Sequence, residues 1–326
     1  MAVESGGVLG RVVRIATRKS ALALAQTATV VAQLEHVAHV TCELVPITTK
    51  GDAQADRSLA AIGGDGVFVK ELMQALLEGR ADLAVHSAKD LPTTIPADLD
   101  AGAVPLREDA RDALVSSQGR FADLGALPAR ARVGTSSQRR AAQVLAQRPD
   151  VQIVPLRGNV DSRMKKLENG TLDAAILALA GLRRLGAAAL EPARPIDPQV
   201  MVPAAGQGAL FVQCRADDEE TRGLIAALNH DASALAVRLE RRFLAKVGAG
   251  CVAPIGVHAR VRAGSFHLLA LIAATDGTTS VRRQVEGTAA DAAEALRIVE
   301  AVASEMLAAG GRELIDAAEK RDSKTS

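Results

Sequence analysis

Short apolar runs alternate with amphipathic stretches along the first two thirds of the chain. The apolar runs predict strands over residues 12–17, 41–48, 82–86, 132–134, 151–156 and 209–213. The amphipathic stretches predict helices over residues 21–35, 68–79 and 137–148, and a further helix that opens after Asn159. A strand that leads through a helix to another strand is the repeating unit of a parallel α/β sheet. This part of the chain is therefore predicted to be α/β.

The last third of the chain shows a different order of elements. A capped amphipathic helix is predicted over residues 231–247, and three strands are predicted over 255–262, 266–275 and 278–285. Two more helices, over residues 289–308 and 311–320, follow the strands. Consecutive strands followed by helices predict a small α+β domain.

Two observations indicate that the α/β part consists of two similar lobes. Residues 79–91 (GRADLAVHSAKDL) and 170–182 (GTLDAAILALAGL) share Gly, Asp, Ala and Leu at equal spacing. The charged stretch 106–112 and the stretch 204–208 (AAGQG) predict two connections between the lobes. We therefore expect two α/β lobes joined by a double hinge, similar to periplasmic binding proteins, and a small α+β C-terminal domain. The predicted boundaries are 1–107 with 207–227 for lobe 1, 112–203 for lobe 2 and 229–326 for the third domain.

Composition and charge exclude several classes of function. The formal net charge is +1 over 326 residues, so no overall positive field favours nucleic acid. Trp and Tyr are absent and Phe occurs only 5 times, so stacking platforms for bases are not expected. No run of about 18 apolar residues is present, and the first residues lack the pattern of a signal peptide. We expect a cytoplasmic protein without a membrane or nucleic-acid partner.

Arginines stand at the starts of predicted helices, where the helix dipole disfavours a cation. Arg139 and Arg140 fall in the first turn of one helix, and Arg163 falls in the first turn of the next. Ser136 and Ser137 lie at the N-terminus of the first of these helices, so hydroxyl and N–H groups are expected beside the guanidinium groups. Such a cluster is a site for a carboxylate or a phosphate. The alternative is a solvated basic face with ordinary serine capping.

Lobe 1 opens with the same arrangement, because Arg18 and Ser20 lie between its first strand and its first helix. Lys89 and Asp90 follow the strand at 82–86, and open α/β sheets bind ligands outside the carboxyl ends of their strands. A carboxylate that faces arginines could stabilise a cationic intermediate or move a proton. The alternative for Asp90 is a helix cap or an ion pair with Lys89.

Other kinds of site find no support in the sequence. The histidines are scattered without metal-ligand spacing, and the G-x-S-x-G, Walker and Rossmann patterns are missing. Three cysteines cannot form a closed set of disulfides. Cys42 and Cys214 lie in strand-like runs as apolar residues, whereas Cys251 follows a Gly-Ala-Gly loop. Cys251 is therefore either a reactive thiol or an inert small residue.

The chain resembles the porphobilinogen deaminases, also called hydroxymethylbilane synthases, in register from about Arg14 to about Leu314. The resemblance is carried by RIATRKSALALAQT, ITTKGD, GVFVKELMQALLEGRADLAVHSAKDLPT, REDARDAL, VGTSSQRRAAQ, LRGNVDSRMKKLENGTLDAAILALAGLRRLG, PAAGQGAL and GAGCVAPIG. It implies a three-domain, monomeric transferase of tetrapyrrole, porphyrin and haem biosynthesis. Such an enzyme joins four molecules of porphobilinogen head to tail, releases ammonia each time, and hydrolyses off linear hydroxymethylbilane.

The resemblance also implies a cofactor and roles for individual residues. The family primes its reaction with a dipyrromethane that is made from substrate and held by a thioether to a loop cysteine, which Cys251 matches. Asp90 matches the aspartate that assists deamination and contacts the pyrrole nitrogens, and Lys89 matches a residue that contacts cofactor carboxylates. The other residues implied to bind the cofactor are Thr17, Arg18, Ser20, Phe68, Ser136, Ser137, Arg139, Arg140, Arg157, Arg163 and Gln207. No metal is implied.

One departure from the family concerns the glycine-rich loop AAIGGDG. Many relatives carry lysines where this chain has Ala61 and Asp65, so contacts that such lysines make to the cofactor are not carried over. The main alternative from another class is a two-lobe anion-binding protein, such as a solute receptor or the effector domain of a regulator. That alternative does not explain a third domain that presents Cys251.

Overall fold

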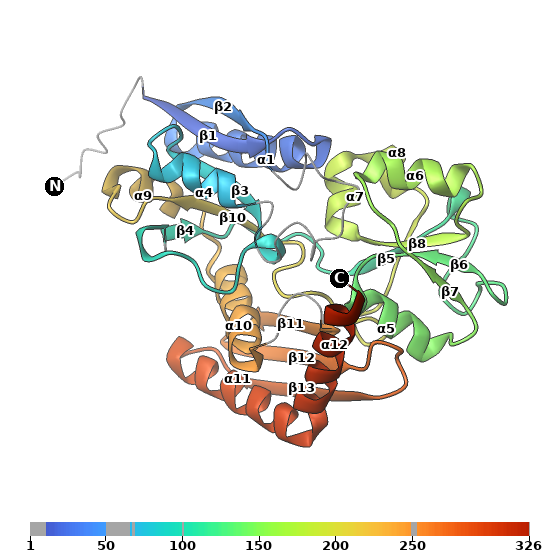
Figure 1. Cartoon of the computed structure of the whole chain (residues 1–326). Helices are drawn as coiled ribbons and strands as arrows, with labels where there is room; N and C mark the ends of the chain where they lie inside the picture. The colour runs from blue at the N-terminus through green and yellow to red at the C-terminus, as the bar shows by residue number, and fades with distance from the viewer. Residues whose placement is uncertain (1–10, 50–65, 67–68, 100, 249–252, 326) are drawn as a thin grey trace.

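The computed structural model describes residues 11–49, 66, 69–99, 101–248 and 253–325. Within these residues the chain forms three β-sheets with helices packed beside them (Figure 1). Two sheets have five strands each and the third has three. The predicted fold class, two α/β lobes and a smaller α+β unit, is confirmed by these sheets. No helix in the described ranges is both long and apolar enough to cross a membrane.

Lobe 1 is built on the sheet with strand order β2-β1-β3-β10-β4. Its strands are β1 Val12–Arg18, β2 Thr41–Ile47, β3 Leu83–Ser87, β4 Ala101–Ala103 and β10 Leu210–Cys214, and its helices are α1 Ala21–Ala38, α4 Lys70–Leu77 and α9 Glu219–Ala226. The first three strands are parallel, whereas β10 pairs antiparallel with both β3 and β4. Both faces of β1 are buried, because Ile15 joins the cluster that contains Leu34 of α1 and Ala16 joins the cluster that contains Leu76 of α4.

Lobe 2 repeats this topology with strand order β7-β6-β8-β5-β9. Its strands are β5 Asp112–Val115, β6 Arg132–Gly134, β7 Gln152–Val154, β8 Ala174–Ala178 and β9 Ala193–Pro195, and its helices are α5 Gln138–Gln147, α6 Val160–Glu168, α7 Leu179–Leu185 and α8 Ala187–Leu190. Strands β7, β6 and β8 are parallel, and β5 is antiparallel to both β8 and β9. Helix α7 contacts α1 of lobe 1, and the two lie side by side in Figure 1.

The sequence repeat marks equivalent positions in the two lobes. Asp82 immediately precedes β3, and Asp173 immediately precedes β8. Asp82 accepts hydrogen bonds from the backbone N of Arg14 at 2.8 Å and from its Nη2 at 2.7 Å. Asp173 likewise accepts from the backbone N of Arg132 at 2.7 Å and from its Nε at 3.2 Å. We call each of these pairs an Asp–Arg latch, because it ties β3 to β1 in lobe 1 and β8 to β6 in lobe 2.

The third domain consists of an antiparallel sheet and three helices. Its elements are α10 Asp231–Val247, β11 Ile255–Arg262, β12 Ser265–Ala273, β13 Ser280–Thr288, α11 Ala292–Met306 and α12 Arg312–Thr325. Phe243 of α10 and Phe266 of β12 are almost fully buried in its core, together with apolar residues of α11. The predicted bounds of α10 and β11 are reproduced by the structure.

The chain crosses between the lobes through residues 107–111, the first crossing segment, and residues 203–209, the second crossing segment. The two segments touch at Gly208, where an added Cβ would lie 2.4 Å from the carbonyl oxygen of Glu108. Gly206 meets lobe 1 in the same way, because an added Cβ would lie 2.9 Å from the carbonyl carbon of Ala88. Gly206 has a φ of +70° and Gly208 a φ of +88°, so their conformation and the close approach both require glycine.

Glu240 of α10 fastens both crossing segments to the third domain. Its carboxylate is fully buried and accepts hydrogen bonds from Arg107 at 2.7 and 3.1 Å and from the backbone N of Gly206 at 2.6 Å. A further bond comes from the backbone N of Ala259 at 2.7 Å. Burial acts to raise the pKa of Glu240, but Arg107 and His258 outweigh it and the net shift is downward. Any displacement of α10 therefore acts on both connections between the lobes.

The structure differs from the sequence prediction mainly in short elements. Strands β4 and β9 have three residues each and were not expected from the sequence pattern. Strand β5 begins at Asp112, inside the stretch 106–112 that was predicted to be a hinge. So few residues contain too little periodicity to identify a strand, and their pairing partners lie far away in the sequence.

Candidate active site

Lobe 1 places its candidate residues at one edge of its sheet. β1 and β3 are adjacent and parallel, so Arg18 at the end of β1 and the Lys89–Asp90 pair after β3 lie at the same edge. Residues 88–90 form a single 3₁₀ turn. The turn is held in place by a 3.0 Å hydrogen bond from the backbone N of Ala88 to the oxygen of Ala209, next to the close packing of Gly206. The position of Asp90 is therefore coupled to the second crossing segment.

Lobe 2 places serines and arginines at the corresponding edge of its own sheet. The Ser136 hydroxyl donates to the oxygen of Leu156 at 3.1 Å and accepts from its backbone N at 2.9 Å, which joins the turns after β6 and β7. Ser137 caps α5 by accepting from the backbone N of Arg140. Arg157 follows β7 and is half-buried, and Arg163 in the first turn of α6 donates from Nε to Gly158 at 2.9 Å.

Asp112 binds both arginines of α5. This aspartate is fully buried, and Arg139 donates to it from Nη1 at 2.7 Å while Arg140 donates from Nε at 2.8 Å. Arg139 also donates to the oxygen of Val202 at 2.7 Å. Burial alone would raise the pKa of Asp112, but Arg139 and Arg140 outweigh it and hold the pKa well below its usual range. One carboxylate thus binds two guanidinium groups but neutralises only one of their two positive charges.

Gln207 completes this network from the second crossing segment. Its Nε2 donates to the oxygen of Ala110 at 2.8 Å and to Asp112 at 3.0 Å, and its Oε1 accepts from Arg140 at 3.4 Å. Its side chain is 1% exposed. Gln207 therefore holds the two crossing segments and α5 together.

Cationic groups of both lobes meet at this point. The Lys89 side chain reaches solvent, yet the protein around it desolvates the ammonium group and lowers its pKa to about 8. Asp90 opposes this shift, whereas the charge of Arg140 adds to it. Burial lowers the pKa of Arg163 to about 10, and Arg140 contributes in the same direction. Lys89 of lobe 1 and the arginines of lobe 2 thus repel one another electrostatically, as expected of a site that binds several negative charges.

The third domain packs directly under the Lys89–Asp90 turn. Val237 of α10 belongs to the same buried cluster as Ala88 and Ala209. Arg241 donates from Nη2 to the backbone oxygens of Pro92 and Thr93, at 2.8 and 3.1 Å. Helix α10 ends at Val247, four positions before Cys251. Cys251, Phe68, Ala61 and Asp65 themselves lie outside the described residues.

Three of the predicted cofactor ligands have side chains that point inward in this structure. The Thr17 side chain is 0% exposed, and its hydroxyl accepts a hydrogen bond from Thr27 at 2.7 Å. Arg139 is 6% exposed and Gln207 is 1% exposed, and both are engaged in the Asp112 network. In this structure these three side chains support their neighbours, and their contacts with the cofactor stay predictions. Ser20 serves as the N-cap of α1, which was the alternative considered for such serines.

Two residues that matter for the site were not identified from the sequence. Asp112 was assigned to a hinge, although an acidic residue at the head of an apolar DALV run is a signal for a buried, paired carboxylate. Glu240 lies within an otherwise regular amphipathic helix, and nothing in its local pattern separates it from the exposed charges around it.

Two solved structures of periplasmic binding proteins show a distant likeness to this chain. A periplasmic substrate-binding protein of an ABC transporter from Coxiella burnetii has a TM-score of 0.41 at 14% identity, and covers 68% of this chain and 94% of its own. The periplasmic aliphatic sulphonate binding protein SsuA from Escherichia coli has a TM-score of 0.39 at 17% identity, and covers 73% of this chain and 70% of its own.

Comparisons of the sequence find similarity over most of the chain. The family model described as porphobilinogen deaminase, dipyromethane cofactor binding domain, matches residues 13–223, and the model for the porphobilinogen deaminase C-terminal domain matches residues 234–308. A porphobilinogen deaminase from Roseiflexus sp. (strain RS-1) is 48% identical over 305 residues, which cover 92% of this chain and 97% of that protein. Together with the cationic site shared by both lobes, these matches show that the chain belongs to the porphobilinogen deaminase family.

Proposed function

We propose that the Lys89–Asp90 turn performs the chemistry of this enzyme and that lobe 2 binds the carboxylates of its ligands. The enzyme is a hydroxymethylbilane synthase, which joins four porphobilinogen molecules on a dipyrromethane primer, releases ammonia each time and finally releases linear hydroxymethylbilane. One observation supports this division of roles above the others. The Lys89–Asp90 turn is bonded through Ala88 to Ala209 of the second crossing segment, and Gln207 of the same segment contacts Arg140 and Asp112. The charges of Arg140 and Asp112 also act on Lys89.

The donor set suits a dipyrromethane, whose two pyrroles carry acetate and propionate groups. Asp112 neutralises only one of the two positive charges on α5. Among the described residues, Arg163 has no carboxylate partner, and Lys89 adds a further cation. Arginine binds carboxylates through two parallel N–H donors, so it suits a chain that gains two carboxylates with every added pyrrole. When bound through Cys251, the group would supply the free pyrrole carbon to which the first new unit is joined.

Asp90 would act on porphobilinogen itself. Loss of ammonia from the aminomethyl group leaves a positively charged pyrrole, and a fixed carboxylate stabilises that charge as it develops. The 3₁₀ turn holds the Asp90 backbone through Ala88 and Ala209, so little reorganisation is needed during the reaction. Lys89 would donate to ligand carboxylates on the same side. Arg140 would be oriented by Asp112 and Gln207.

Intact-mass measurement of the enzyme from a porphyrin-making host tests the attachment. The wild-type chain should carry a covalent two-pyrrole adduct, and Cys251→Ser should lose it. Cys214→Ser is the matched control, because the Cys214 thiol is fully buried in lobe 1 and burial raises its pKa to about 11. An unmodified wild-type chain, or an adduct retained by Cys251→Ser, would contradict the proposal.

Several coarser features complete the proposal. The division into residues 1–107 with 207–227, residues 112–203 and residues 229–326 is supported by the separate apolar clusters of the three sheets. The monomeric state and the cytoplasmic location remain predictions from the sequence, and light scattering of the purified holoenzyme tests the first. The alternative of a two-lobe anion-binding protein loses support, because the family match extends over the third domain.

A further inference from the structure

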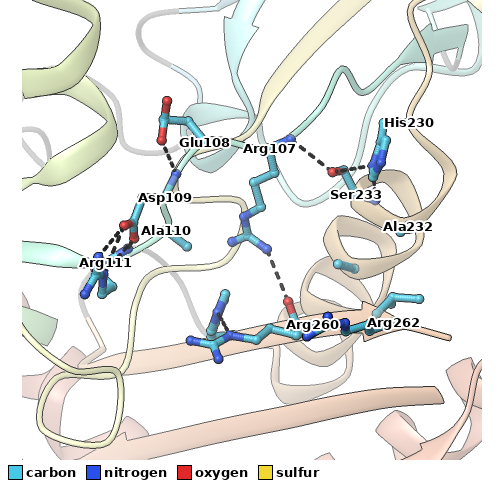
Figure 2. Close-up of a pocket in the computed structure, with 14 residues that line it drawn as sticks. Arg107, Glu108, Asp109, Ala110, Arg111, His230, Ala232, Ser233, Arg260 and Arg262 are labelled. Carbon is cyan, nitrogen blue, oxygen red and sulfur yellow. Dashed lines mark hydrogen bonds and ion pairs between the residues drawn. The ribbon is translucent and has the colours of Figure 1, made fainter.

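A cavity of about 480 Å³ lies where the first crossing segment meets the third domain (Figure 2). Its walls are the first crossing segment, the first turn of α10 and the second half of β11. Neither Lys89 nor Asp90 lines it, and none of the lobe 2 arginines at the candidate active site does so. Small-molecule sites commonly occupy about 300–1,000 Å³, so the cavity is large enough for a ligand of its own.

The acidic groups in this cavity already have cationic partners. Asp109 is held by Arg111, with 2.7 Å between Oδ2 and Nη2, and Glu108 is held by Arg183 at 2.6 Å. Arg107, which also lines the cavity, is occupied by Glu240. The crossing segment therefore contributes a balanced set of charges. A ligand would meet no uncompensated carboxylate from this wall.

The wall formed by β11 carries two arginines that lack a carboxylate partner among the described residues, whereas Nδ1 of its His258 lies 3.3 Å from Oε1 of Glu240. His258, Arg260 and Arg262 alternate along the strand and lie on one face, whereas Val257 and Ala259 face the core of the third domain. Within the described part of the chain, neither Arg260 nor Arg262 forms an ion pair. The Nε of Arg260 donates to Nε2 of His258 at 3.3 Å, and its two terminal nitrogens are left over. Two like charges side by side attract an anion.

The first turn of α10 adds a donor from the opposite wall. His230 caps this 17-residue helix, and its Nδ1 accepts from the backbone N of Ser233 at 3.2 Å. The Ser233 hydroxyl lies 2.9 Å from the same nitrogen. Because Nδ1 is an acceptor, the neutral ring carries its proton on Nε2, which can donate to a ligand. The helix dipole at this end also favours a negative charge.

We propose that this cavity binds a small, multiply charged oxyanion, carrying carboxylate or phosphate groups, between Arg260 and Arg262 on one side and His230 on the other. The site is separate from the reaction of the Lys89–Asp90 turn. It has a volume suited to a ligand, two unpaired guanidinium groups and a helix start with an available N–H donor. Glu108 and Asp109 are already paired with Arg183 and Arg111, so they do not neutralise Arg260 and Arg262. This distinguishes the site from an ordinary basic surface.

Isothermal titration calorimetry of the holoenzyme with citrate and, separately, with pyrophosphate tests the proposal and distinguishes the two kinds of oxyanion. At least one of them should bind the wild type, and Arg260→Gln/Arg262→Gln should weaken that binding at least about tenfold, since charge-assisted hydrogen bonds from two guanidinium groups are lost. Arg283→Gln/Arg297→Gln removes the same charge from exposed positions of β13 and α11, and it should bind as the wild type does.

A second variant probes the α10 wall without removing the helix cap. His230→Asn keeps a favourable N-cap residue but lacks the Nε2 donor, so affinity should fall by about two- to tenfold. Binding to the residues of the active site would be unaffected by all of these changes. The proposal is overturned if neither anion binds the wild type, or if Arg260→Gln/Arg262→Gln binds as tightly as the wild type. Unchanged affinity in His230→Asn would overturn the part assigned to α10.

Discussion

Lobe 1 and lobe 2 share a strand order and an Asp–Arg latch, yet they differ at the residues that follow the third strand. In lobe 1 the strand β3 leads into a 3₁₀ turn with Lys89 and Asp90. In lobe 2 the equivalent residues are Ala180 and Gly181, inside helix α7. One scaffold thus occurs twice, while the polar pair occurs once. The comparison teaches that the sheet determines where a ligand lies and that a few loop residues determine what happens to it.

The two lobes also handle their charges differently. Lobe 2 buries two arginines beside a counter-charge of its own, Asp112, and so fixes their orientation before any ligand arrives. Lobe 1 leaves Lys89 accessible to solvent beside Asp90. A rigid, paired cluster suits binding, whereas an accessible pair suits chemistry on a substrate that enters and leaves. The predictions below test this contrast, beginning with the largest effect.

Removing the counter-charge of lobe 2 should have the largest effect. Asp112→Asn leaves Arg139 and Arg140 buried without a carboxylate, and the free energy of unfolding at neutral pH should fall by about 3–5 kcal/mol. Denaturant unfolding measures this change. Asp150→Asn is the control, because it breaks an exposed ion pair with Arg148 in the same lobe and should change stability little.

The same variant has a pH signature. The pKa of Asp112 in the folded protein lies below its ordinary value of 3.8, so its stabilisation is complete above that value and disappears as pH falls through the folded pKa. The difference in stability between wild type and Asp112→Asn should therefore shrink on acidification. A difference that stays constant into the acid range would show that the charge of Asp112 is not what stabilises lobe 2.

Removing the carboxylate of lobe 1 should affect the reaction instead of the fold. Asp90→Asn should keep the covalent adduct but turn over porphobilinogen about 10²–10³-fold more slowly, as expected when one preorganised electrostatic contact to a developing charge is lost. Steady-state turnover together with intact mass measures both properties. Near-normal turnover would remove Asp90 from the mechanism.

A swap between lobes sharpens this test. Gly181→Asp places a carboxylate at the equivalent position of lobe 2, where a new Cβ would contact only Leu22 of α1 at 3.5 Å. In the Asp90→Asn background this change should restore no turnover, because the position faces α1 instead of the arginine cluster. Restored turnover would show that the two lobes are interchangeable, contrary to the comparison.

The Asp–Arg latches should contribute smaller and unequal amounts. The Asp82 side chain is 9% exposed and that of Asp173 is 33% exposed. Asp82→Asn should therefore destabilise by about 1–3 kcal/mol, and Asp173→Asn should destabilise less, because water partly replaces its lost bonds. Denaturant unfolding of the two single variants tests the order. Equal losses would indicate that solvent exposure does not separate the two latches.

The smallest expected effect concerns the charge of Lys89. Its pKa of about 8 means that the group is protonated below that value and loses its charge as pH rises through it. The KM for porphobilinogen should therefore rise by about two- to fivefold between neutral and more alkaline pH, the size typical of a solvent-accessible ion pair. In Lys89→Arg the charge persists and this rise should be absent. An identical profile in both enzymes would assign the pH dependence to another group.

Long elements were predictable from the sequence, whereas the charge network was not. The bounds of α10 and β11 follow from apolar spacing alone, because each buries one regular face against the same core. Asp112 was missed because its partners, Arg139 and Arg140, lie 27 and 28 positions later. The positions of Arg139 and Arg140 at a helix start indicate an anion, and the sequence pattern predicts that this anion is a ligand. In the structure the carboxylate that both arginines bind is Asp112 of the same lobe. The resemblance supplied the roles of Asp90 and Cys251, which no local pattern could assign.

Strand β10 has a consequence for the order in which the molecule is made. It lies between β3 and β4, and among the described strands β4 pairs with β10 alone. The strands of lobe 2 all lie between residues 112 and 195, but the sheet of lobe 1 is incomplete until Leu210–Cys214 has been synthesised. As the chain leaves the ribosome, the second lobe is thus the first to possess all its strands. The sheet of lobe 1, which carries Asp90, is therefore completed after lobe 2 can already have folded.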